Sequence, residues 1–159
     1  MGKINFKKLL ISFLLPFVAG FIGSFFTVSA ISVWYENLLK PSLNPPSWVF
    51  APVWTILYFL MGLSLYLAWS KVGTKMRLTR RPIFVFFIQI FLNTSWSLFF
   101  FGLQNPLLAL INIALLWLSI IWMISVFSKF SKTASWLIIP YFFWVSFAFY
   151  LNFAIWFLN

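Results

Sequence analysis

Indole rings, rather than acids and bases, are the groups in this sequence with the most scope for chemistry. The chain of 159 residues has ten tryptophans, no histidine and no cysteine, and Glu36 is its only acidic residue. A lone carboxylate cannot form a paired-carboxylate site, and a Ser/His/Asp triad is excluded. Zinc and iron sites are built from histidine, cysteine and acidic ligands, so we predict no metal site. Indole remains as a side chain that is readily oxidised.

The spacing of two tryptophans indicates flat faces that could hold a ligand. Trp54 and Tyr58 are four residues apart, so on a helix they share one face. Trp144, Ala148 and Asn152 repeat this spacing, and the small Ala148 leaves room for the edge of a flat ring. Several such faces converging in one bundle would suit a large planar apolar ligand.

Other tryptophans have a simpler explanation. Tryptophan and tyrosine are enriched where a membrane meets water. A structural role in such a belt is favoured for four residues near the ends of apolar runs, Trp34, Trp48, Trp136 and Trp156.

Membrane helices are the elements that must position these side chains. The chain is 64% hydrophobic and 8% charged, whereas a soluble domain has about 25% charged residues. Charge-free runs supply the spans, since about 20 apolar residues cross a bilayer core, and one long run is divided by a turn at residues 102–106. We predict an all-α membrane protein with a single domain over residues 1–159. Its five transmembrane helices are expected at about 7–30, 47–70, 82–102, 106–128 and 133–157.

The first apolar run resembles a secretory signal, because lysines precede it and the small residues Val28, Ser29 and Ala30 follow. A usual signal core is shorter than this run. We therefore expect the run to be retained as the first helix.

The basic residues are distributed unevenly over the predicted loops. Ten of the eleven lie on the side shared by the N-terminus and the second and fourth loops, and Lys40 lies on the other side. Cytoplasmic loops carry the excess of lysine and arginine, so we predict the N-terminus inside and the C-terminus outside. The net charge of +10 then reflects topology and contact with anionic lipid, not nucleic acid. The outer loop 31–46 is stiffened by its prolines.

Small and amide side chains within the spans have two interpretations. Asn93 and Asn152 are costly to leave unpaired in lipid, so both should face inward. They could bond another helix or a ligand: the two are equally favoured for Asn93, and helix bonding is favoured for Asn152. Ala19, Gly23 and Thr27 form a stripe of small residues, which favours helix packing over ligand contact.

Ordered motifs along the whole chain carry a family resemblance. They comprise Gly20-Phe21-Ile22-Gly23, Trp34-Tyr35, residues 40–58, Leu92-Asn93-Thr94-Ser95-Trp96 with Gln89, Phe100-Phe101-Gly102, Pro140-Tyr141-Phe142-Phe143-Trp144, Phe147-Ala148 and Leu151-Asn152. In type and spacing they resemble the TspO/MBR family, which includes bacterial tryptophan-rich sensory proteins and the mitochondrial translocator protein, or peripheral-type benzodiazepine receptor.

This resemblance implies a five-helix bundle, often a homodimer, with a pocket that opens toward the first loop. It implies binding of porphyrins such as protoporphyrin IX and haem, and of drug-like planar ligands. The ligand-binding residues that it implies, with Tyr58 added from the face of Trp54, are Tyr35 at the lid, Trp54, Tyr58, Asn93, Trp96, Trp144 and Ala148.

Three hypotheses on function follow. The leading one is a receptor or sensor in a bacterial cell membrane that binds porphyrin or another planar apolar molecule, contacts lipid and needs no cofactor. The second is light-dependent protoporphyrin degradation, with porphyrin as substrate and with Trp54 and Trp144 as the catalytic residues. The third is a transporter or a scaffold for tetrapyrrole traffic; proton coupling is disfavoured because no predicted span holds an acidic residue or a histidine.

Cholesterol is not predicted as the native ligand. The mitochondrial members carry a proposed cholesterol motif in the fifth helix, with a tyrosine followed by an arginine. Here Phe153 stands at the tyrosine position and no basic residue follows it.

Overall fold

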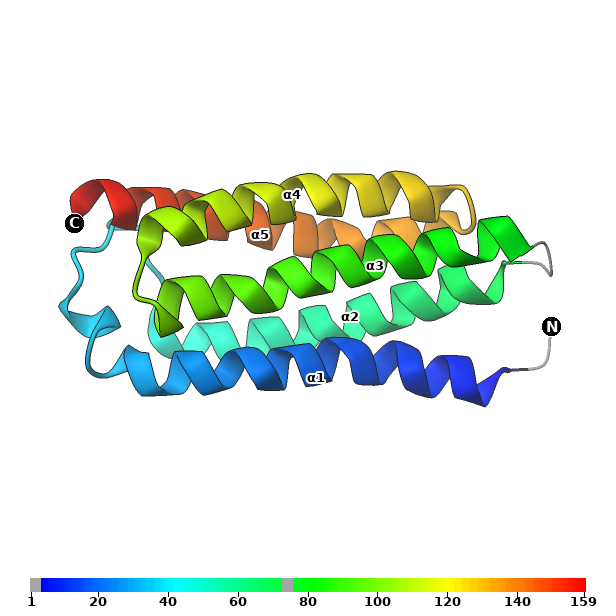
Figure 1. The fold of residues 1–159 in the computed structure, drawn as a ribbon, viewed down its shortest axis with the longest axis horizontal. Helices are drawn as coiled ribbons and strands as arrows, with labels where there is room; N and C mark the ends of the chain where they lie inside the picture. The colour runs from blue at the N-terminus through cyan, green and yellow to red at the C-terminus, as the bar shows by residue number, and fades with distance from the viewer. Residues whose placement is uncertain (1–3, 73–75) are drawn as a thin grey trace.

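Five long helices run alongside one another in the computed structural model, which describes residues 4–72 and 76–159. Figure 1 shows the two ends of the chain at opposite ends of the bundle. Each helix is long and apolar enough to cross a bilayer, which confirms the predicted all-α, five-span class. The helices are α1 (Phe6–Ile31), α2 (Phe50–Ser70), α3 (Met76–Ser97), α4 (Pro106–Ser128) and α5 (Lys132–Leu158).

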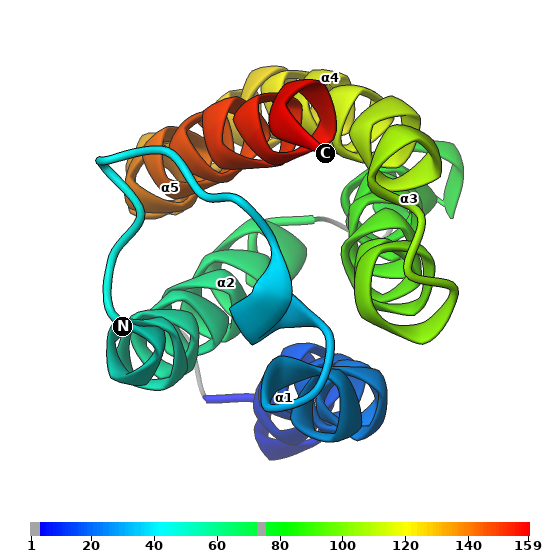
Figure 2. The same ribbon diagram turned by 90° about the vertical axis from the view of Figure 1, so that its left-hand side faces the viewer.

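The helices do not follow one another in chain order around the bundle. Helix α1 packs against α2 and α3, α2 also packs against α5, and α4 packs against α3 and α5. The end-on view in Figure 2 shows this ring, with the connection after α1 crossing its end. Four helices thus surround a common interior at this end, while α4 supports α3 and α5 from behind.

Local sequence signals set several helix ends. The side chains of Asn5, Asn105 and Ser131 accept hydrogen bonds from backbone N–H groups three residues further on, as N-cap residues do. Pro106 follows Asn105 at the first helical position, where no N–H group is needed. These caps place the starts of α1, α4 and α5 within one residue of the predicted starts.

The surface of the bundle is apolar and its interior is more mixed. Large side chains such as Phe21, Phe91 and Phe143 are more than 60% exposed, and so many exposed apolar side chains identify a face for lipid. The interior combines methionine, leucine and phenylalanine with buried polar groups, among them Gln89 and Asn93. The exposed face of the bundle is therefore apolar, and the buried polar groups lie inside it.

Helices α1 and α2 approach closely in the half of the bundle near the start of α1. A Cβ atom at Gly62 would lie 2.9 Å from the ring of Phe13 and 3.1 Å from the backbone oxygen of Ser12. Small residues permit this kind of backbone approach in membrane bundles.

The connection between α1 and α2, residues 32–49, covers one end of the bundle; residues 32–46 are called the lid below. The lid contains a 3-10 turn, Tyr35–Asn37, and a second such turn, Ser47–Val49, leads into α2. Asn159 bonds the backbone of Leu39 twice, accepting from its N–H at 2.9 Å and donating to its carbonyl at 3.0 Å. The lid is thereby attached to the end of α5.

Candidate functional site

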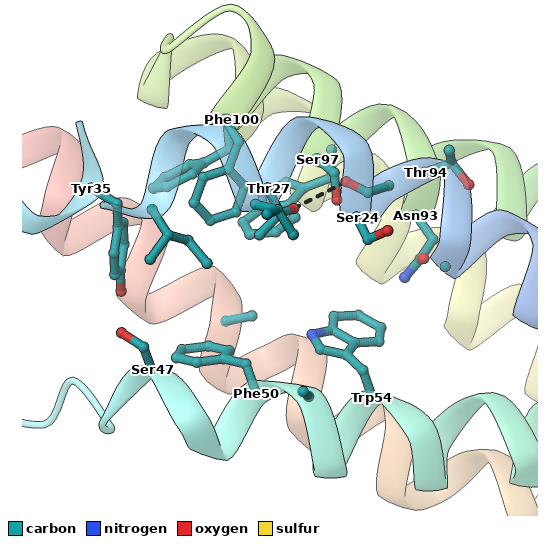
Figure 3. Close-up of a pocket in the computed structure, with 18 of the residues that line it drawn as sticks. Ser24, Thr27, Tyr35, Ser47, Phe50, Trp54, Asn93, Thr94, Ser97 and Phe100 are labelled. Atoms are coloured by element: carbon teal, nitrogen blue, oxygen red, sulfur yellow. Dashed lines mark hydrogen bonds between the residues drawn. The ribbon is translucent and has the colours of Figure 1, made fainter. Parts of the chain in front are cut away.

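A cavity of about 310 Å³ lies beneath the lid, between α1, α2, α3 and α5. Figure 3 shows side chains from these elements facing one another across it, with Phe50 and Trp54 on one wall and Thr27 and Phe100 on the opposite wall. Ligand pockets in proteins span about 300–1,000 Å³ and are mostly apolar with a few polar groups. The cavity has the size and lining of a small-molecule site.

Six of the seven sequence-predicted binding residues line this cavity. They are Tyr35, Trp54, Tyr58, Asn93, Trp96 and Ala148. The spacing argument on α2 explains Trp54 and Tyr58, whose rings lie 5.4 Å apart and 31° from parallel. Together the two rings give the α2 side of the cavity an aromatic surface.

Trp144 is the predicted residue that the structure does not place among the lining residues. Its ring packs edge-on against Phe50, with 5.9 Å between centroids, and Phe50 is the residue that lines the cavity. The indole Nε1 of Trp144 is buried and has no hydrogen-bond partner among the described residues. Trp144 therefore supports the wall from behind Phe50.

A chain of hydrogen bonds runs from the cavity into the bundle. The Tyr58 hydroxyl donates to Asn93 Oδ1 at 3.3 Å, and Asn93 Nδ2 donates to the Tyr141 hydroxyl at 3.0 Å. Tyr141 in turn donates to Gln89 Oε1 at 3.1 Å. This chain links α2, α3 and α5, so the amide of Asn93 serves helix packing and also borders the cavity.

Asn152 has the structural role that the sequence favours for it, and it also lines the cavity. Its Oδ1 accepts a hydrogen bond from Trp96 Nε1 at 2.9 Å, and its Nδ2 donates to the Pro106 carbonyl at 2.8 Å. Both polar ends of this amide are therefore occupied by protein groups.

Three residues of the α1 wall were predicted to favour helix packing over ligand contact. Ala19, Gly23 and Thr27 border the cavity, together with Gly20 and Ser24. The stripe also packs against a helix, because a Cβ atom at Gly23 would lie 3.1 Å from Ser97 Oγ on α3. A stripe of small residues predicts close packing, and the same absence of side chains leaves open space beside it.

The two phenylalanines at one end of the cavity were not among the predicted binding residues. Phe100 and Phe101 lie in a π-helical turn, Leu98–Gly102, that continues α3. The Phe100 ring stacks on Trp96 with 5.2 Å between centroids, and the Phe101 ring lies edge-on to the same indole. Phe100 lies four residues after Trp96, so helical spacing alone places it on the face of that indole, whereas Phe101 lies five residues after it and reaches the same indole within the π-helical turn.

The lid closes the cavity with Tyr35, which is only 7% exposed. Its hydroxyl donates to Asn44 Oδ1 at 2.9 Å, and the Lys40 ammonium lies 4.9 Å from the centre of its ring. Burial raises the pKa of the Tyr35 phenol above its ordinary value, and the hydrogen bond to Asn44 offsets part of that rise. The phenol is therefore neutral at physiological pH.

These features together define an integral membrane protein with an aromatic cavity beneath a lid at one end of its helix bundle. The family model described as the TspO/MBR family matches residues 12–157. The chain belongs to this family.

Curated relatives match nearly the whole chain. It is 45% identical to the tryptophan-rich protein TspO of Archaeoglobus fulgidus, over 98% of this chain and 99% of the relative. It is 48% identical to the protein of the same name from Chlorobaculum tepidum, over 88% of each chain. The human translocator protein is 34% identical over 90% of this chain and 85% of its own.

Proposed function

We propose that this protein is a membrane receptor that binds a planar apolar ligand, a porphyrin such as protoporphyrin IX, in the cavity beneath the lid. The observation that carries the proposal is the wall of rings around this cavity, contributed by Trp54, Tyr58, Trp96 and Phe100 from helices α2 and α3 and the turn that continues α3. Flat rings in offset or edge-on contact stabilise one another by about 0.5–1.5 kcal/mol beyond the burial of their area.

Several polar groups that line the cavity are already hydrogen-bonded within the protein, which favours an apolar ligand. Thr27 and Ser24 donate to backbone carbonyls of their own helix, at 3.0 and 2.6 Å. The amide of Asn152 is engaged at both ends, by Trp96 and by Pro106. A ligand would therefore be held mainly by shape and stacking, and it need not supply several hydrogen bonds.

A titration with protoporphyrin IX tests this proposal. The purified protein in lipid nanodiscs should bind it saturably in darkness, with quenching of tryptophan fluorescence. Ala148→Phe adds a ring at a small lining residue and should weaken binding at least tenfold. Phe143→Leu, on the lipid-facing side of the same helix, is the matched control and should bind as the wild type does. Equal binding by all three proteins would contradict the proposal.

Light-dependent porphyrin degradation is the second function that we propose to test. The supporting observation is the position of Trp54, an oxidisable ring that borders the cavity and lies 6.2 Å from Tyr141 as well as beside Tyr58. Illumination of the bound complex should then bleach the porphyrin faster than illumination of porphyrin in empty nanodiscs. Trp54→Phe should remove the difference while dark binding persists. Transport would instead require net uptake into sealed vesicles.

A further inference from the structure

The side of the cavity between α1 and α2 is built differently from its lidded end. Ser24 and Val28 of α1 and Ala51 of α2 line the cavity and are also exposed on the outer surface of the bundle. Val28 is 72% exposed. A residue that borders both the cavity and the outside marks a wall one side chain thick.

Helix geometry places these three residues on the seam between α1 and α2. Ser24 and Val28 follow Gly20 at intervals of four, so they continue its face toward the end of α1. The face of Gly20 is turned to α2, because a Cβ atom there would clash with the Tyr58 ring. On α2, Ala51 is seven residues, about two turns, before Tyr58 and lies on the same side.

The seam is closed at one end and open at the other. Near the middle of the bundle the Tyr58 ring fills the space beside Gly20, and deeper still Phe13 packs over Gly62. Toward the lid, the side chains that face one another across the seam are smaller: serine and valine on α1 and alanine on α2. The structure therefore has close contact below Tyr58 and small side chains above it.

We place the midpoint of α2 at the centre of the bilayer, which puts the open part of the seam within the hydrocarbon core. With a rise of about 1.5 Å per residue, Tyr58 and Ala51 lie roughly 3 and 14 Å from the midpoint of α2. The half-thickness of the hydrocarbon core is about 15 Å. The polar groups nearby are satisfied within their own helices, since Ser24 donates to Phe21 and Thr55 donates to Ala51, so the seam presents no unpaired donor to lipid.

The lidded end, in contrast, is tied down at several points. The Tyr35–Asn44 hydrogen bond, the Lys40 ammonium over the Tyr35 ring and the two Asn159–Leu39 hydrogen bonds hold it over the cavity. Opening this end would break all of these contacts, whereas passage through the seam breaks none of them.

We propose that the α1–α2 seam at Ser24, Val28 and Ala51 is a lateral portal, through which a planar apolar ligand dissolved in the bilayer enters the cavity while the lid stays closed. This inference rests on the proposed binding function. The cavity has a volume of about 310 Å³. A macrocycle too large for this volume would then extend its edge through the seam into lipid.

The test compares entry through the seam with entry through the lidded end. The protein has no cysteine of its own, so a disulfide can be introduced at one chosen pair. Protoporphyrin IX is pre-dissolved in vesicles that contain the protein, and its association and dissociation rates are followed by tryptophan quenching. Val28→Trp with Ala51→Leu narrows the portal, and Val18→Trp, on an exposed face of α1 that does not line the cavity, is the control. Leu39→Cys with Asn159→Cys, once oxidised, replaces the two Asn159–Leu39 hydrogen bonds with a covalent link that locks the lid.

The portal predicts that the narrowed variant loses at least tenfold in both the association and the dissociation rate, whereas damage to the binding wall alone would raise the dissociation rate; the control and the locked lid stay within twofold of wild type. Unchanged rates in the narrowed variant, or a block by the locked lid, would overturn the portal while leaving the binding function intact. Absence of saturable binding by the wild type would overturn both.

Discussion

The indole N–H of Trp96 donates to Oδ1 of Asn152 over 2.9 Å, so a ring of the cavity wall on α3 is held in place by α5. The same amide donates to the Pro106 carbonyl at the start of α4. One buried side chain thus joins three helices and fixes the orientation of an aromatic wall, which couples the stability of the bundle to the shape of its cavity.

Asn152→Leu should destabilise the bundle by about 1 kcal/mol, because it leaves the Trp96 N–H unpaired in an apolar interior and removes the additional hydrogen bond to the Pro106 carbonyl. The measurement is the free energy of unfolding by SDS in mixed micelles. Phe153→Leu changes the neighbouring exposed position and serves as the control. A loss no larger than that of the control would show that the hydrogen bonds contribute nothing to stability.

The lid should loosen in alkali because of Tyr35. Its raised pKa means that the folded lid favours the neutral phenol. The contribution of this phenol to the stability of the lid is therefore complete below its ordinary pKa of about 10, and it is lost as the pH rises through the higher pKa of the folded state. Hydrogen exchange of residues 36–46 should therefore accelerate, beyond its normal pH dependence, above about pH 10.

Tyr35→Phe supplies the control for this pH effect, since it keeps the ring under Lys40 and removes the hydroxyl. Its lid should exchange faster than wild type at neutral pH, because the bond to Asn44 is gone, and should lack the additional alkaline step. A wild-type step that persists in the variant would assign the effect to Lys40 or another group.

The orientation predicted from the basic residues can be measured with single cysteines, as the chain has none of its own. Ser42→Cys in the lid and Ser128→Cys at the end of α4 are both at exposed positions. In intact cells, a membrane-impermeant maleimide should label position 42, and position 128 should be labelled only after permeabilisation. The reverse pattern would contradict an N-terminus inside the cell.

The two tryptophans that the sequence ranks together should differ in binding. Trp54 borders the cavity, whereas Trp144 lies behind Phe50. Trp54→Leu should raise the Kd for protoporphyrin IX at least tenfold, about 1.4 kcal/mol, while Trp144→Leu should raise it less than threefold. A larger effect at Trp144 would mean that the bound state rearranges the Phe50 wall.

The helices were predictable because membrane spans need long charge-free runs, and the sequence has them. The largest error in a boundary is at α3, which begins at Met76 although the charge-free run begins at Pro82. Lysine and arginine are good helix formers, so the helix extends beyond the apolar segment. The absence of charge marks the membrane-crossing part of a helix and does not mark its end.

The residues that line the cavity were predictable only where the residue type and its spacing indicate a single role. Tryptophan and tyrosine four residues apart indicated the α2 wall, and the family resemblance added Asn93, Trp96 and Ala148. Gly23 could pack or leave space, and it does both. The position of the Phe101 ring depends on a π-helical turn, and the separation of Trp144 from the cavity depends on where the Phe50 ring lies, so three-dimensional packing had to decide both.

A crystal structure of the protein with zinc protoporphyrin tests the central claim most directly, because the anomalous signal of zinc locates the macrocycle without reference to the protein. The metal is expected within the cavity, with the macrocycle against Trp54 and Tyr58 beneath a closed lid and its edge directed between α1 and α2. A zinc peak on the outer surface of the bundle, with the cavity unchanged, would contradict it.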